Sequence, residues 1–101
     1  MWLLAMFDLP VKTKPDKKRY VQFRRILLYE GFTMLQYSVY ARYCRSEEAS
    51  ESLRSHVERQ LPRYGRVRLL AVTDRQFAKM RTYNGKISVA NEEPPAQLVL
   101  F

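Results

Sequence analysis

The feature that most limits the possible folds is a short apolar run at the start of the chain. Residues 2–7 read Trp-Leu-Leu-Ala-Met-Phe, and Asp8-Leu9-Pro10 ends the run. A short, continuously apolar segment that stops at a proline is typical of a strand in the middle of its sheet, where both faces are covered. The run is too short for a membrane span, and it lacks the basic leader and cleavage site of a signal peptide. We expect a central strand, with Asp8 where the chain leaves the sheet.

Helical and strand patterns alternate along the rest of the chain. Asp16 and Ser46 are the expected N-caps of two helices, because their side chains can accept hydrogen bonds from first-turn amides, and Gly31 is the expected residue after the first helix. Asn84-Gly85 indicates a turn. The expected bounds are a helix over residues 16–30, strands over 32–36 and 38–44, a helix over 46–61, and a strand over 65–74.

The order strand, helix, strand, strand, helix, strand predicts an α+β fold, the ferredoxin-like βαββαβ sandwich. Both helices of such a fold cover one face of a four-stranded antiparallel sheet and leave the other face open. An open sheet face on a chain of 101 residues favours association with a second copy, so we expect a homodimer.

The end of the chain is expected to act separately from this domain. We assign residues 1–89 to the ferredoxin-like domain and residues 90–101 to a linker and a C-terminal interaction strand. The double proline at 94–95 allows the apolar residues after it to leave their own core and pair with the edge of a partner sheet, or to return to their own sheet. The expected partner-binding residues are Leu98, Val99, Leu100 and Phe101.

The charge of the chain points to a polyanionic partner. Lysine and arginine number 18 against 10 acidic residues, for a formal net charge of +8. Such a balance favours binding to nucleic acid, although each cation alone could be an ordinary solvated surface charge. With no base-reading motif, we expect recognition of the backbone and shape of the nucleic acid. The candidate nucleic-acid-binding residues are Lys12, Lys14, Lys17, Lys18, Arg19, Arg42, Arg75 and Lys86.

Asp8 is the residue that best fits a chemical role. The single cysteine, Cys44, cannot form an internal disulfide or a cysteine-based zinc site and is consistent with a reducing cytoplasm. The single histidine, His56, has no ligand or nucleophile at a suitable spacing. Asp8 could simply begin a turn, or it could be a ligand of a divalent metal. One carboxylate holds Mg²⁺ poorly, but a two-fold axis near Asp8 would bring a second carboxylate to the ion.

Three segments together carry a family resemblance: residues 6–10 (MFDLP), 31–40 (GFTMLQYSVY) and 67–77 (VRLLAVTDRQF). In this order and spacing the chain resembles the second, small universal CRISPR-associated adaptation protein family, whose members are often labelled endoribonucleases. The resemblance implies a ferredoxin-like homodimer that binds short duplex DNA and bridges dimers of the CRISPR integrase. It also implies that Asp8 is a catalytic and metal-ligand aspartate, with Mg²⁺ shared between the two subunits and single-stranded RNA as a further substrate.

Three functions therefore stay open at the level of the sequence. The first is a DNA-binding subunit of spacer acquisition, and the second is a metal-dependent endonuclease that uses paired Asp8 carboxylates. The third is a protein-only dimer, toxin-like or regulatory, that does not touch nucleic acid. The chain has Tyr20, Gln22 and Met34 where some members of the family have arginine. These departures favour the first function over the second.

Overall fold

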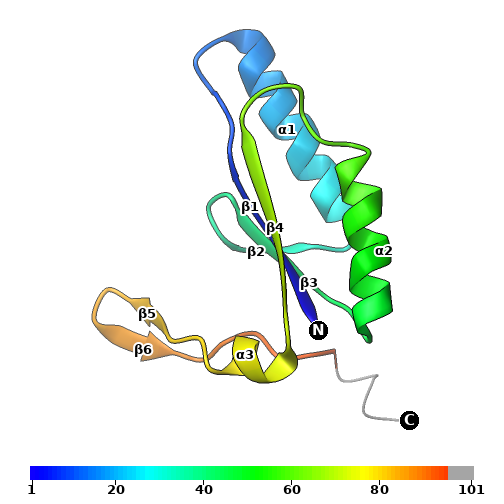
Figure 1. Cartoon of the computed structure of the whole chain (residues 1–101). Helices are drawn as coiled ribbons and strands as arrows, with labels where there is room; N and C mark the ends of the chain where they lie inside the picture. The colour runs from blue at the N-terminus through cyan, green and yellow to red at the C-terminus, as the bar shows by residue number, and fades with distance from the viewer. Residues whose placement is uncertain (96–101) are drawn as a thin grey trace.

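The computed structural model describes residues 1–95 of the chain (Figure 1). The elements in order are β1 (Trp2–Asp8), α1 (Lys14–Tyr29), β2 (Thr33–Gln36), β3 (Val39–Tyr43), α2 (Glu47–Glu58), β4 (Arg66–Val72), α3 (Asp74–Ala78), β5 (Thr82–Asn84) and β6 (Ile87–Val89). The first six elements follow the predicted βαββαβ order. The ferredoxin-like α+β prediction is confirmed.

The main sheet is antiparallel, and its strand order is β2-β3-β1-β4. β1 lies in the middle, where it pairs with β3 on one side and with β4 on the other. The prediction of a central first strand is confirmed. β4 lies at one edge, and the end of β1 at Asp8 lies opposite the start of β4 at Arg66.

The core lies between the sheet and the two long helices, which cover the same face of the sheet (Figure 1). Alternate side chains of a strand point to the same face, so every second residue of β1 enters this core. The core residues of β1 are Leu3, Ala5 and Phe7, and they pack with Tyr40 and Cys44 of the β3 region, Phe23 and Leu27 of α1, and Leu53 and Val57 of α2.

The other face of the sheet is only partly covered. Phe77 of α3 stacks on Trp2 with ring centroids 4.1 Å apart, so α3 covers the end of the face where β1 begins. The expectation of a wholly open face was therefore wrong at this end, because the chain turns back over the sheet after β4. Further along, Leu4 is partly buried, and its cross-strand neighbour Leu70 is 49% exposed. An apolar surface remains uncovered there.

The N-cap of α1 lies three residues before the predicted one, Asp16. Thr13 is the N-cap, and Asp16 is the third residue of the helix. The Thr13 hydroxyl accepts a hydrogen bond from the Asp16 amide, and the Asp16 carboxylate accepts one from the Thr13 amide. This reciprocal capping box satisfies two amides that would otherwise lack partners. The hydrogen bond from the Thr13 backbone, together with Arg19, lowers the pKa of Asp16 below its usual value.

The cap of α2 and the glycine after α1 are as predicted, whereas the ends of α2 and β4 come earlier than predicted. Ser46 caps α2, and Gly31 follows α1 with a φ of 88°. α2 ends at Glu58, not near residue 61, because Arg59 is its C-cap and the Gln60 amide bonds to the carbonyl oxygen of Val57, which tightens the last turn before the segment leading to β4. β4 ends at Val72, not at residue 74, because Thr73 caps α3.

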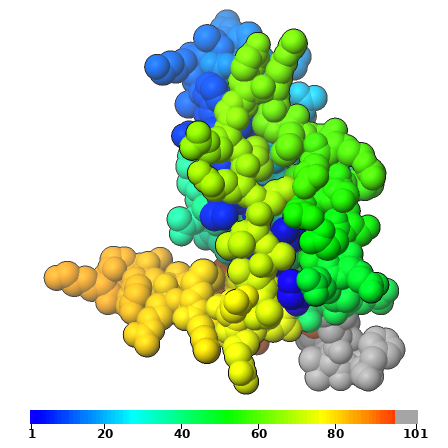
Figure 2. Space-filling view, viewed as in Figure 1, coloured from blue at the N-terminus to red at the C-terminus, as the bar shows by residue number. Residues whose placement is uncertain are grey.

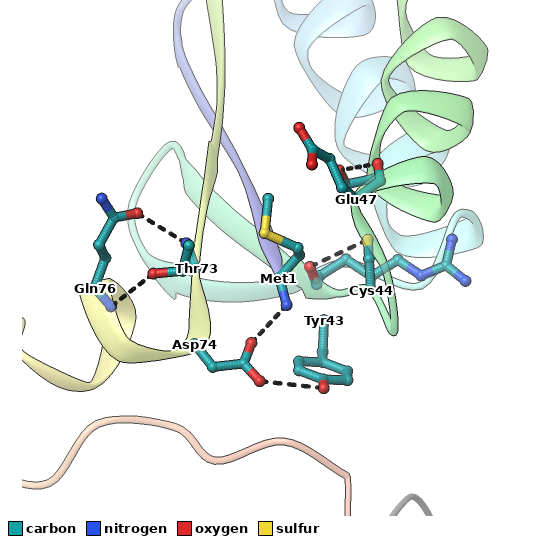
Figure 3. Close-up of polar contacts among 9 residues, drawn as sticks. Met1, Tyr43, Cys44, Glu47, Thr73, Asp74 and Gln76 are labelled. Atoms are coloured by element: carbon teal, nitrogen blue, oxygen red, sulfur yellow. Dashed lines mark hydrogen bonds and ion pairs between the residues drawn. The ribbon is translucent and has the colours of Figure 1, made fainter.

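Asp74 ties the start of the chain to α3 (Figure 3). The Met1 ammonium lies 2.5 Å from one oxygen of Asp74, and the Tyr43 hydroxyl donates to the other at 3.3 Å. Burial, and secondarily the charge of Asp74, raises the pKa of Tyr43 above its usual value. These bonds hold β1, β3 and α3 together at one end of the sheet.

After α3 the chain forms a small hairpin, β5-β6, around the predicted turn. The segment from Ala90 to Pro95 has neither helix nor strand, as expected of a linker. The predicted interaction strand, Leu98 to Phe101, lies outside the described residues and stays a prediction. Within residues 1–95, no helix is both long and apolar enough to cross a membrane.

Candidate functional site

Asp8 is exposed at the end of β1, on the face of the sheet that the long helices do not cover. Its cross-strand neighbour on β4 is Arg66, and the preceding residue on the same face, Met6, lies opposite Arg68. Directly paired residues of an antiparallel sheet share a face, so Arg66 lies beside Asp8 and Arg68 lies one pair further along the same face. Within residues 1–95 the carboxylate has no hydrogen-bond or ion-pair partner at the distances of such bonds. Its oxygens are available to a ligand.

Gly65 packs closely against the backbone of Asp8 and Leu9. It has a φ of 94°, and a Cβ at this position would lie 2.8 Å from the carbonyl oxygen of Asp8 and 2.6 Å from Cδ2 of the buried Leu9. Any side chain here would therefore push against the segment that leaves the sheet. The end of β1 at Asp8 can lie this close to the start of β4 because residue 65 has no side chain.

Four candidate cations gather near this end of the sheet. Lys12 lies in the loop that follows Asp8, and Lys14, Lys17 and Lys18 lie in the first turns of α1. All four are exposed, and the start of α1 is at the end of the molecule that β1 reaches (Figure 1). Lys17 and Lys18 also line a shallow hollow of about 420 Å³ along α1. The structure brings these lysines together as predicted.

Arg19 already has partners inside the protein. Its guanidinium lies 2.6 Å from the Asp16 carboxylate and 4.8 Å from the centre of the Tyr64 ring. An ion pair and a cation–π contact reduce the charge that this arginine offers to a ligand. Its predicted role in binding nucleic acid remains a prediction.

The remaining three candidate cations lie elsewhere on the chain. Arg42 of β3 pairs in register with Leu3, near the start of β1, and it packs against Gly31. Arg75 is in α3, and Lys86 is at the tip of the hairpin, at the opposite end of the molecule from the start of α1 (Figure 1). One copy of the chain therefore carries these three cations apart from the lysines at the start of α1.

A metal site cannot be completed by the described part of a single chain. Within residues 1–95 there is no group of three or more histidine, cysteine, aspartate or glutamate residues that could hold a metal ion. The exposed, unpartnered carboxylate of Asp8 nevertheless fits Mg²⁺, which takes oxygen ligands and uses one or two carboxylates. Cys44 is buried, and its burial raises the pKa of its thiol. His56 lies 3.4 Å from the Glu30 carboxylate, which satisfies it on the surface of α2.

Comparison with known proteins decides the family. The sequence model described as CRISPR associated protein Cas2 matches residues 1–80, which is most of the chain and all of the main sheet. The chain belongs to the Cas2 family. It is 47% identical over its whole length to the whole of a protein of Parvibaculum lavamentivorans named CRISPR-associated endoribonuclease Cas2. It is 39% identical over its whole length to 88% of a protein of the same name in Flavobacterium psychrophilum. The resemblance seen in the sequence is thereby confirmed, and the hairpin at residues 82–89 lies beyond the family match.

Sequence reasoning missed two features of this site. The predicted topology contained the antiparallel pairing of β1 with β4, but the register that places Arg66 opposite Asp8 needs the alignment of the two strands as well. The close approach of Gly65 has a weaker signal, a glycine at the start of a strand, which also fits an ordinary turn.

The approach of Gly65 to Asp8 predicts the effect of substitution at this position. Gly65→Ala should destabilise the protein by about 1–3 kcal/mol, because a non-glycine residue with positive φ is strained and its Cβ would overlap Leu9 and Asp8. Gly85→Ala is the matched control, since Gly85 also has a positive φ, of 60°, but a Cβ there meets nothing within 4 Å. Urea denaturation measures both. Equal losses for the two variants would contradict the proposed contact.

Proposed function

We propose that this Cas2-family chain is a nucleic-acid-binding subunit of CRISPR adaptation. In this proposal it acts as a homodimer, binds short duplex DNA, and bridges dimers of the integrase during insertion into the repeat array. The observation that carries the proposal is the group of four exposed lysines in the loop before α1 and in its first turns, at the end of the sheet where β1 ends. Family membership supports the CRISPR setting.

The uncovered sheet face supports the homodimer. Leu70 is 49% exposed in the middle of this face, and Leu4 and Leu35 are only partly buried. Burying an apolar side chain yields about 25 cal/mol for each Å² removed from water, so a matching surface would be stabilised by contact here. A two-fold contact places the same patch on both partners. An axis that passes near Asp8 would also bring the two Asp8 carboxylates together.

Duplex DNA suits the exposed lysines. Each phosphate that a lysine neutralises releases condensed counterions, which favours binding without reading the base sequence. The outer surface of α2 carries the opposite charge, with exposed glutamates at positions 47, 48, 51 and 58. A polyanion is repelled there, so the duplex is expected at the α1 side of the molecule.

The integrase contact is proposed from the sequence alone. Leu98, Val99, Leu100 and Phe101 form an apolar segment that can add a strand to the edge of a partner sheet. Removing residues 96–101 would show whether integrase binding depends on this segment.

The DNA-binding proposal predicts a change in salt dependence. Replacing Lys12, Lys14, Lys17 and Lys18 by glutamine should lower the slope of log affinity against log salt by about 3.6, since each phosphate contact contributes about 0.9. The control is Arg54→Gln on α2 with Arg59→Gln at its C-cap, which removes two cations from the side of the acidic helix and should leave the slope nearly unchanged. Fluorescence anisotropy with a short labelled duplex measures both variants.

Two results of that measurement would count against the proposal. An unchanged slope in the lysine variant would remove these residues from the interface. Failure of the wild-type protein to bind duplex or single-stranded nucleic acid at low salt would favour the protein-only dimer.

A second function, endoribonuclease activity, is favoured by the exposed and unpartnered carboxylate of Asp8 and by the names of the relatives. In a dimer, the two Asp8 carboxylates would hold Mg²⁺, which supplies positive charge to a phosphodiester when bound. Arg66, paired across the strands with Asp8, would hold a neighbouring phosphate of the substrate. Arg66 is then a binding residue and Asp8 the metal ligand.

The nuclease proposal predicts that cleavage depends on Asp8. Asp8→Asn keeps the shape of the side chain and removes its charge, so Mg²⁺-dependent cleavage of single-stranded RNA should fall by at least about tenfold, the scale of a lost metal-site interaction. Chelation of Mg²⁺ should abolish the activity of the wild-type protein. Glu48→Gln, a change of the same kind on the exposed surface of α2, should leave cleavage unchanged. Full activity of Asp8→Asn in highly purified protein would assign the cleavage to another site or a contaminant.

A further inference from the structure

A groove lies in the helical layer of the molecule, between α1 and the joining segment, residues 59–65, which leads from α2 to β4. Its volume is about 330 Å³, at the lower end of the range of about 300–1,000 Å³ that is typical of ligand pockets. Phe23 and Ile26 are three residues apart on α1 and so share a face of the helix. Together with Leu61 and Pro62 of the joining segment they form an apolar lining. The groove can therefore receive an apolar side chain.

The joining segment is held at both ends, so the groove is formed before any partner arrives. At one end, the Gln60 side-chain nitrogen donates to the Glu30 carboxylate and to the carbonyl oxygen of His56, both at 3.2 Å. At the other end, the guanidinium of Arg19 lies 4.8 Å from the centre of the Tyr64 ring. Figure 2 shows the joining segment, coloured green to yellow-green, beside the blue region that contains the start of α1.

The apolar lining of the groove is open to solvent. Leu61 is 43% exposed, and Ile26 and Pro62 are only partly buried. Covering such side chains removes apolar surface from water and so favours association. The proposed dimer contact lies on the opposite face of the sheet, and it leaves this groove open to a different partner.

The charges at the rim of the groove select the kind of partner. The residues that line it include two arginines, Arg19 and Arg63, and no acidic residue. Arg19 is already paired with Asp16. Arg63 and the nearby Arg59 are exposed, and within residues 1–95 neither forms an ion pair. This positive charge favours a partner with carboxylates on either side of the apolar side chain that the groove receives.

A peptide fits this combination better than nucleic acid or a second copy of the chain. Gln22 at the rim carries an amide, which can both donate to and accept from a peptide backbone. Phosphates would be attracted to the arginines but would gain nothing from the apolar lining. The acidic surface of a second copy lies on α2, whose larger apolar side chains, Leu53 and Val57, are buried in their own core. That surface therefore has no large apolar side chain to insert.

We propose that this groove is a docking site for an acidic segment of another protein. The segment inserts one large apolar side chain between α1 and the joining segment, and its carboxylates lie against Arg63 and Arg59. A buried apolar anchor with a polar rim is the arrangement that concentrates binding energy in protein interfaces. The proposal does not depend on the binding of DNA, because the groove and the rim arginines are separate from the lysines of the proposed DNA contact.

The test begins with the full-length protein as the target for a phage-displayed library of random peptides. The selected peptides should share a large apolar residue with aspartate or glutamate near it. Labelled with a fluorophore, these peptides then serve as the probes. Fluorescence anisotropy measures their affinity for the wild-type protein and for variants of the groove, and circular dichroism reports folding.

Leu61→Glu should weaken peptide binding by at least about tenfold, because it removes apolar surface from the lining and repels the acidic peptide. Val21→Glu is the matched control, since Val21 is 45% exposed on α1 and does not line the groove. It should bind the peptides as the wild-type protein does. Arg63→Gln should weaken binding by about two- to fivefold at low salt, and this loss should shrink as salt screens the charges.

A second pair of variants keeps the test decisive if Leu61→Glu does not fold. Gln22→Trp adds a large side chain at an exposed position on the rim, so it should block the groove and weaken peptide binding by at least about tenfold. Val21→Trp carries the same side chain one residue away, outside the groove, and should leave peptide binding unchanged.

Four results would overturn the proposal. A selection that yields no peptide, or peptides whose binding is unchanged in Leu61→Glu and Gln22→Trp, would show that the groove is not a docking site. Displacement of the peptides by short duplex DNA, with an equal loss of duplex affinity in Leu61→Glu, would make the groove part of a nucleic-acid surface. A rise in peptide affinity on removal of residues 96–101 would make the chain's own end the occupant.

Discussion

The pairing of β1 with β3 on one side and β4 on the other is the interaction on which the rest of the structure depends. Alternate residues of this strand supply the core under the long helices, and the residues between them form the middle of the opposite face. One side of the strand therefore stabilises the monomer, while the other side is left with apolar surface and ends in the carboxylate of Asp8. The proposed dimer contact and the proposed metal ligand both lie on this second side.

The distribution of charge follows from how the elements surround this strand. The loop after Asp8 and the start of α1 carry exposed lysines, whereas the outer surface of α2 carries exposed glutamates. Because the two helices lie side by side over one face of the sheet, the molecule has a side that attracts phosphate and a side that repels it (Figure 1). The net charge of the chain alone does not reveal this separation. If the protein binds a duplex as proposed, this separation of charge limits the orientations in which it binds.

The strand order and the placement of the core could be predicted because the apolar run of β1 and the helical periodicity of α1 and α2 leave few alternatives. The predictions were wrong where neighbouring residues compete to cap a helix. Thr13 and Asp16 are both good N-caps, and the reciprocal pair of bonds, which needs Thr13 at the cap, was not visible from the preference of either residue alone. The capping of α3 by Thr73 similarly shortened a strand whose apolar pattern continues to that point.

The candidate site was harder to predict than the fold. Asp8 could be singled out because a carboxylate after an apolar strand is unusual, and the lysines near it are close in sequence. Arg42, Arg75 and Lys86 were chosen as further candidates for their charge, and the fold places them away from these lysines. The hairpin was visible only as a turn at Asn84-Gly85, because its strands of three residues are too short to give a periodic signal.

The central claim is that the uncovered face of the sheet joins two copies of the chain. Leu70→Glu tests it most directly, because Leu70 is half exposed on that face and its replacement leaves the helix-covered core intact. Sedimentation equilibrium should find the wild-type protein as a dimer and the variant as a monomer with an unchanged circular dichroism spectrum. A wild-type protein that is monomeric at high concentration, or a variant that remains a dimer, would contradict the account.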